Sequence, residues 1–175
     1  MRRVPTAYYV REGPVGQVIE LAALQGEVKH LGAIGLGVGA VACYCGPDRK
    51  VTFFELDPEV ERLARDERFF HFLSDCPNNE VVLGDGRLGL ARVPDGSFEV
   101  LILDAFAGDA VPTHLLTREA VEVYGAQLAS GGILLFHVSN RFYELRTVLQ
   151  RVADALGWGM ASAIGAVAGY LLGRR

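Results

Sequence analysis

Five short apolar segments recur along the chain, and each is followed by turn residues and then by a helix-like stretch. Their apolar residues run nearly continuously, which is typical of strands that are covered on both faces of a sheet. The segments comprise residues 30–36, 50–56, 80–84, 98–106 and 131–139. The pattern therefore predicts five central strands.

Three of the intervening stretches have the features of helices. Residues 58–73 begin with Pro58, which suits the first turn of a helix. Residues 117–129 begin with Thr117 as an N-cap, and residues 141–156 place apolar side chains on one face at helical spacing. This alternation of strands and helices predicts an α/β fold with a doubly wound, mostly parallel sheet.

A glycine-rich loop follows the first apolar segment. Gly35, Gly37 and Gly39 lie there, and glycine at a strand end lets the chain turn sharply and lets a ligand touch the backbone. Glu55 ends the second segment, 20 residues after Gly35, the usual distance to a carboxylate that binds ribose hydroxyls. With Ala40 the loop also fits a relaxed dinucleotide fingerprint, so a nicotinamide or flavin enzyme is an alternative.

Two further carboxylates follow the third and fourth apolar segments. Asp85 comes just after the third segment, and Asp104 lies near the end of the fourth. Each residue type is also common as a helix cap or in a turn. Because ligands of such sheets bind at the carboxyl ends of the strands, both acids are expected beside the glycine loop. Together they favour a ligand with a ribose, an adenine and a positive centre.

The motifs "GLGVG", "FFELDPEV", "GDGR" and "LDAFAGDAVPTHLLT" resemble those of the spermidine synthase (aminopropyltransferase) family. This family lies within the class I S-adenosylmethionine-dependent methyltransferase superfamily, and the likeness covers about residues 8–156. It implies a class I methyltransferase-like Rossmann fold. We expect residues 1–29 to form an N-terminal arm and residues 30–175 one nucleoside-binding α/β domain. Both ends are expected to be shortened, with room for one strand at most in residues 159–175.

The resemblance implies S-adenosylmethionine or its decarboxylated form as co-substrate, no metal, and transfer of an aminopropyl group to a small-molecule amine. The residues expected to bind the co-substrate are Gly35, Gly37, Gly39, Glu55, Asp57, Asp85 and Gly86. Asp104 is the expected catalytic residue. The expected acceptor-binding residues are Asp109, Gln17 and His114.

A catalytic carboxylate suits this chemistry. An alkylamine has a pKa of about 10, so it arrives protonated and is not a nucleophile. A carboxylate within hydrogen-bond reach can take that proton and direct the nitrogen at the carbon next to the sulfonium. The remaining task is to hold the amine, the carbon and the sulfur in line.

Composition and charge argue against nucleic acid and membranes as binding partners. The net charge of −4 gives no basic footprint for nucleic acid. The apolar stretch 160–172 has 13 residues, fewer than the roughly 20 that a membrane helix needs, so no membrane insertion is expected. The three cysteines are expected to be buried, reduced thiols in a cytoplasmic protein. A homodimer is compatible with the family resemblance.

Two other functions stay open at this point. One is a true S-adenosylmethionine-dependent methyltransferase, and the other is a catalytically inactive remnant that binds a nucleoside. Some individual side chains also have two interpretations. His137 and Asn140 either line the pocket or simply end the fifth strand, while Tyr9 is expected to pack under the N-terminal arm.

Overall fold

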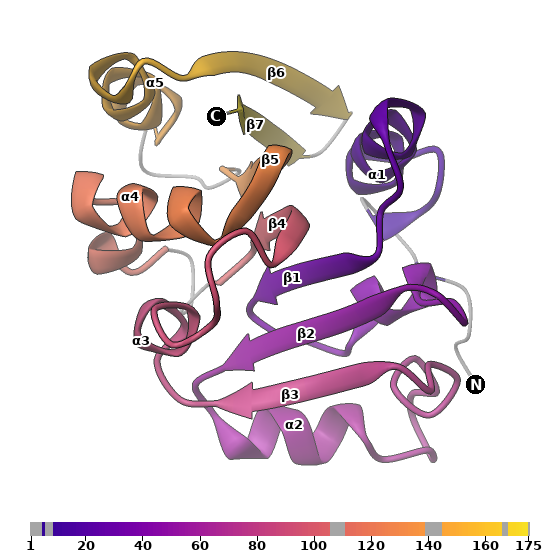
Figure 1. Ribbon diagram of the computed structural model, residues 1–175. Coiled ribbons are helices and arrows are strands. Elements are labelled where there is room, and N and C mark those ends of the chain that lie inside the picture. Colours follow the sequence, from indigo (N-terminus) through magenta and orange to yellow (C-terminus); the bar gives the residue numbers. More distant parts are fainter. Residues whose placement is uncertain (1–4, 6–8, 106–110, 139–144, 166–167, 175) are drawn as a thin grey trace.

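A seven-stranded sheet forms the centre of the computed structural model, which describes residues 5, 9–105, 111–138, 145–165 and 168–174 (Figure 1). The strands are β1 (His30–Ile34), β2 (Lys50–Glu55), β3 (Asn79–Leu83), β4 (Phe98–Leu103), β5 (Leu128–His137), β6 (Gly159–Gly165) and β7 (Ala168–Arg174). Their order in the sheet is β3-β2-β1-β4-β5-β7-β6. Strands β1 to β5 are parallel, whereas β7 is antiparallel to both of its neighbours. The predicted doubly wound, mostly parallel sheet is confirmed, and the strand order reverses between β1 and β4.

Helices cover both faces of the sheet and divide the core in two. One face carries α1 (Pro14–Gln25), the 3-10 helix η2 (Ala40–Tyr44) and α2 (Pro58–Ala64). The opposite face carries α3 (Gly86–Leu90), α4 (Arg118–Gln127) and α5 (Leu145–Leu156). Along β4, Val100 and Ile102 belong to the first core, while Leu101 and Leu103 belong to the second. Burial on both sides accounts for the nearly continuous apolar pattern of these strands.

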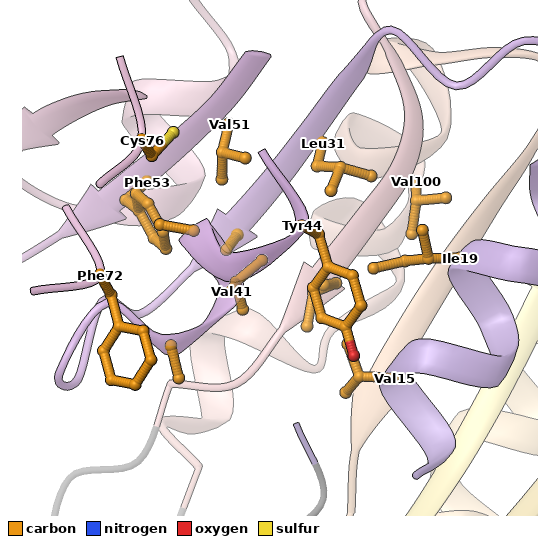
Figure 2. Packing of buried hydrophobic residues seen from close by; sticks show 14 of the residues in the cluster. Val15, Ile19, Leu31, Val41, Tyr44, Val51, Phe53, Phe72, Cys76 and Val100 are labelled. Carbon is orange, nitrogen blue, oxygen red and sulfur yellow. The ribbon is translucent and has the colours of Figure 1, made fainter. Parts of the chain in front are cut away.

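The N-terminal arm contributes to the first core through α1. Val15, Val18 and Ile19 are buried on this helix, and Figure 2 shows Ile19 beside Val100 of the sheet and Val15 beside Tyr44. The apolar residues of the arm thus cover strands that would otherwise be exposed. In the described part of the chain, no helix has the length and apolar character needed to cross a membrane.

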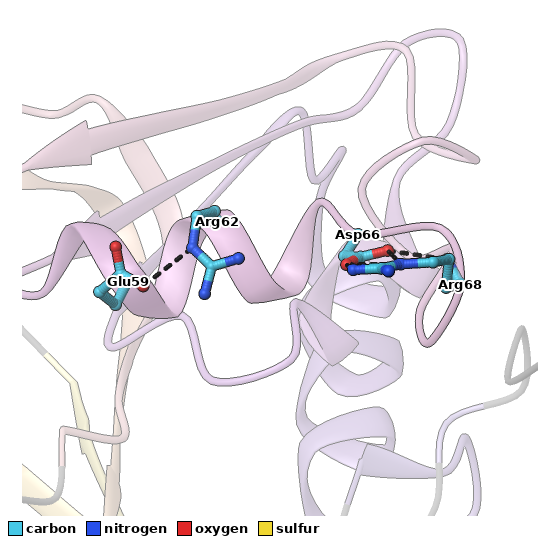
Figure 3. Close-up of polar contacts among 4 residues, drawn as sticks. All are labelled: Glu59, Arg62, Asp66 and Arg68. Atoms are coloured by element: carbon cyan, nitrogen blue, oxygen red, sulfur yellow. Dashed lines mark hydrogen bonds and ion pairs between the residues drawn. The ribbon is translucent and has the colours of Figure 1, made fainter.

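The helix predicted over residues 58–73 is shorter than expected. It begins at Pro58 as predicted, but α2 ends at Ala64. Exposed ion pairs lie on and after it: Arg62 Nε lies 2.8 Å from Glu59 Oε2, and Arg68 Nε donates to Asp66 Oδ1 at 2.8 Å (Figure 3). The Arg68 guanidinium lowers the pKa of Asp66 to about 2. The Asp66–Arg68 pair belongs to a turn rather than to a further turn of helix.

The prediction of at most one C-terminal strand is wrong. Strands β6 and β7 form an antiparallel pair, and β7 adds to the edge of β5 with His137 opposite Tyr170. Their residues are mostly small and do not alternate between apolar and polar, so the sequence shows little of the two-residue period of a strand. The strands form because β7 makes backbone hydrogen bonds to the edge of β5, which the local sequence pattern does not predict.

The prediction of three reduced cysteines is also wrong. Cys45 and Cys76 form a disulfide across 31 positions of sequence, which joins the end of η2 to the segment before β3. Cys43 remains a free thiol, and burial raises its pKa to about 11. Figure 2 shows Cys76 beside Val51 and Phe53, within the first core.

Replacing both Cys45 and Cys76 by alanine should lower the free energy of unfolding by about 4 kcal/mol, because the disulfide restricts a loop of this length in the unfolded chain. Urea denaturation of the variant and of the wild type, each with and without reductant, measures the loss. Cys43→Ala is the matched control and should unfold near the wild type. An equal loss in both variants would contradict a contribution from the disulfide.

Candidate functional site

A cavity of about 600 Å³ opens at the carboxyl ends of the parallel strands, where the strand order reverses. The loop after β1, the end of β2, the start of α3 and the end of β4 form its walls. Tyr9 of the arm and His114 of the 3-10 helix η3 (Thr113–Leu115) also line it. This is the place where open α/β sheets bind their ligands.

The paired ends of β1 and β4 lie close together at the glycine loop. Gly35 has a φ of 97°, and a Cβ atom there would lie 2.3 Å from the carbonyl oxygen of Asp104. Its amide donates to the Phe54 carbonyl at 2.9 Å. Gly37 and Gly39 also have positive φ angles, of 53° and 79°, but a Cβ atom at Gly37 would meet nothing within 4 Å. Only Gly35 is therefore required both by conformation and by the backbone beside it.

Glu55 is held firmly at the end of β2. Its Oε2 accepts a hydrogen bond from the Leu36 amide at 2.9 Å, and its Oε1 accepts one from the Asp57 amide at 2.9 Å. Asp57 in turn is the N-cap of α2, because its Oδ1 accepts from the Glu59 amide at 2.8 Å. Each Glu55 oxygen keeps a further lone pair for a ligand hydroxyl.

Asp85 begins α3 and also contacts the far wall of the cavity. Its Oδ1 accepts from the Leu88 amide at 2.9 Å, and its Oδ2 lies 3.0 Å from His114 Nε2. The Leu88 amide, followed by His114, lowers the pKa of Asp85. A Cβ atom on the next residue, Gly86, would lie 2.6 Å from Ile34 Cγ2, so the start of α3 packs directly on the end of β1.

Asp104 lies at the end of β4 with a carboxylate that contacts two other side chains. Its Oδ1 lies 2.6 Å from His137 Nδ1, and its Oδ2 accepts a hydrogen bond from the Tyr9 hydroxyl. The side chains of Asp104 and His137 are each only 8% exposed. These partners come from β5 and from the N-terminal arm, so three distant parts of the chain meet at one carboxylate.

Most of the residues predicted for the site share this cavity. Its lining includes Gly35, Gly37, Glu55, Asp57, Asp85, Gly86, Asp104 and His114. Gly39 ends the loop as the N-cap of η2 and is not among the lining residues; a Cβ atom there would meet Leu73 at 3.0 Å.

One of the predicted acceptor-binding residues, Gln17, does not line the cavity. Gln17 lies on the exposed face of α1 and donates to the Glu12 carbonyl at 2.8 Å, while Val18 and Ile19 of the same helix belong to the first core. Asp109 lies outside the described residues, as does Asn140. The described residues contain no group of three or more His, Cys, Asp or Glu side chains placed to hold a metal ion.

The contacts that Tyr9 and His137 make with Asp104 were not predicted. Tyr9 was expected only to pack under the arm, yet it lines the cavity. His137 follows Phe136, which pairs with Leu103 in the parallel register of β4 and β5. A histidine placed one residue beyond that pair, level with Asp104, is the signal that would have indicated the contact.

Comparisons with known proteins agree with the fold and the sequence motifs. No family model matches the chain. A polyamine aminopropyltransferase of Vibrio vulnificus is 35% identical over 114 residues, which are 62% of this chain and 36% of that protein. The chain thus matches about a third of the length of this curated relative. The resemblance to aminopropyltransferases inferred from the motifs is confirmed.

Solved structures show the same architecture. A probable spermidine synthase from Corynebacterium glutamicum has a TM-score of 0.75 at 20% identity, over 90% of this chain and 60% of that one. A spermidine synthase in complex with the transition state analogue AdoDATO has a TM-score of 0.69 at 19% identity, over 84% and 55%. Human methyltransferase-like protein 13 in complex with SAH has a TM-score of 0.71 at 17% identity, over 91% and 80%. The class I methyltransferase-like Rossmann fold is confirmed.

Gly35→Ala should lower the free energy of unfolding by about 3 kcal/mol. The new Cβ atom makes the left-handed backbone conformation costly and also clashes with the carbonyl oxygen of Asp104. Gly37→Ala is the matched control, with the conformational cost of about 1 kcal/mol alone. Chemical denaturation of the two variants measures the difference. Similar losses would show that the close approach of β1 and β4 does not constrain this loop.

Proposed function

We propose that this spermidine synthase-like chain binds decarboxylated S-adenosylmethionine or S-adenosylmethionine and transfers an aminopropyl group to a small-molecule amine. The observation that carries the proposal is a partly buried carboxylate, Asp104, in the same cavity as a glycine loop and the ribose-type acid Glu55. The curated relative named polyamine aminopropyltransferase supports it. The fold alone does not, because methyltransferases share it.

The co-substrate would lie along the loop after β1 and across the ends of β2 and β3. Gly35 and Gly37 line the cavity, and the open space beside Gly37 would leave its backbone accessible to the methionine-derived part of the ligand. The free lone pairs of Glu55 would accept hydrogen bonds from the ribose hydroxyls. Asp85 and Gly86 would meet the adenine, with the Asp85 carboxylate already oriented by the Leu88 amide.

Asp104 would act on the acceptor. The protonated amine gives a proton to the carboxylate, and the freed nitrogen attacks the carbon of the aminopropyl group that is bonded to sulfur. The carbon–nitrogen bond forms as the carbon–sulfur bond breaks, and the electron pair of that bond stays on sulfur as a neutral thioether. Asp104 then releases its proton to water, so the cycle needs no further reactant.

A cationic ligand also suits the electrostatics of this position. A carboxylate that is 8% exposed lies in surroundings less polar than water, where its attraction to a sulfonium or an ammonium is stronger than at the surface. Its two hydrogen-bond donors compensate for part of its lost hydration in the absence of a ligand. A cationic group therefore suits this end of the cavity.

Calorimetric titration should show that decarboxylated S-adenosylmethionine or methylthioadenosine binds more tightly than S-adenosylmethionine or NAD.

Glu55→Ala should lower the affinity for every adenosyl ligand about 10-fold or more, because it removes hydrogen bonds to a charged acceptor. Glu59→Ala is the control, since Glu59 is exposed and does not line the cavity. A preference for S-adenosylmethionine would favour methyl transfer instead, and binding of NAD alone would contradict the assigned co-substrate.

Asp104→Asn should lower the transfer rate by about 100-fold or more while the affinity for the adenosyl ligand changes little, because the amide cannot take the acceptor's proton. Steady-state rates with a panel of diamines and monoamines, together with calorimetry, separate the two effects. The exposed residue Asp48 does not line the cavity and offers a control in Asp48→Asn, which should keep the wild-type rate. Transfer that survives in the Asp104 variant would contradict its role.

A further inference from the structure

His137 is placed beside Asp104 by the register of the sheet. Leu103 of β4 pairs with Phe136 of β5, so the next residues of these parallel strands lie level with one another. The contact between His137 Nδ1 and Asp104 Oδ1 measures 2.6 Å. The backbone of Asp104 is fixed as well, since its amide donates to the Ile34 carbonyl at 2.9 Å.

The direction of this hydrogen bond follows from the chemistry of its partners. An ionised carboxylate only accepts hydrogen bonds, so Nδ1 of His137 carries the proton and donates it. Both side chains are 8% exposed, which leaves little water to replace either partner. Loss of the imidazole would thus leave Oδ1 of Asp104 largely buried and without this donor.

Asp104 lines the cavity, whereas His137 is not part of its lining. The imidazole therefore approaches the carboxylate from the side away from the ligand space. Its bond to Oδ1 turns the other oxygen, Oδ2, toward Tyr9, a residue that does line the cavity. Oδ2 is accordingly the oxygen presented to a bound acceptor.

We propose that His137 is a positioning residue for the transfer reaction: it holds the Asp104 carboxylate with Oδ2 directed at the acceptor amine. This inference rests on the proposed function. The acceptor's proton passes to Oδ2, and His137 keeps its Nδ1 proton throughout, so the balance of the transfer step is unchanged. A carboxylate without this contact would rotate about its side-chain bonds and spend less time in the productive orientation.

Two substitutions separate positioning from packing. His137→Asn retains an amide N–H near the place of Nδ1, whereas His137→Leu has a comparable size and no donor. His137→Leu should lower kcat about 10- to 100-fold, with little change in the KM or the calorimetric affinity for the adenosyl ligand. His137→Asn should recover most of that loss. His137→Val, which suits a strand, serves as a second variant without a donor if the leucine variant does not fold.

Equal loss in the asparagine and leucine variants, an unchanged kcat in the leucine variant, or a parallel loss of ligand affinity would each overturn the proposal. Nuclear magnetic resonance of the ligand-free protein gives a readout that needs no turnover. The Nδ1 proton of His137, assigned by its absence in His137→Asn, should be visible in the wild type and shifted in Asp104→Asn.

These readouts distinguish the two levels of inference. A wild-type protein that binds an adenosyl ligand but transfers nothing to any amine contradicts the proposed function, while the Nδ1 signal still tests whether His137 holds the carboxylate. If the Nδ1 signal is the same in the wild type and in Asp104→Asn, the role of His137 is overturned, even if the wild type transfers the group.

Discussion

The site depends on how closely the ends of β1 and β4 approach one another. At Gly35 there is no room for a Cβ atom, because one would lie 2.3 Å from the carbonyl oxygen of Asp104. The Asp104 amide bonds to the Ile34 carbonyl at 2.9 Å, so the two strands remain paired to the point where both end. A glycine loop and a carboxylate that are far apart in sequence thereby face the same cavity. If the two strand ends lay further apart, the glycine loop and Asp104 could not contact the same ligand.

The acids around the cavity are held by the same hydrogen bonds that build the fold. Asp57 and Asp85 are the N-caps of α2 and α3, and Glu55 accepts from the backbone of the glycine loop. Helix caps of this kind contribute about 1 kcal/mol each to stability. The carboxylates therefore have fixed orientations before any ligand arrives, which lowers the entropy lost on binding. The same carboxylates thus stabilise the fold and line the cavity.

The central sheet and much of the site could be predicted because their signals are local in sequence. A continuous apolar segment, a glycine loop and an acid at the next strand end indicate a buried parallel strand and its ligand edge. Other features depend on contacts between distant segments. The spacing of Cys45 and Cys76 does not reveal their pairing, and the small residues of β6 and β7 hide a strand pair that only the edge of β5 completes. The position of Gln17 also depends on such contacts, since the packing of α1 on the sheet turns this residue toward solvent.

The fold does not choose between aminopropyl and methyl transfer, because both kinds of protein share it. The choice rests on what surrounds the reacting carbon. A methyl acceptor that is neutral needs little from a carboxylate, whereas a protonated amine must lose a proton before it can attack. Asp104 is a nearly buried acid at the cavity wall, oriented from behind by His137 and contacted from the arm by Tyr9. Such an arrangement suits an acceptor that is a protonated amine, and together with the relative named polyamine aminopropyltransferase it supports the proposed aminopropyl transfer.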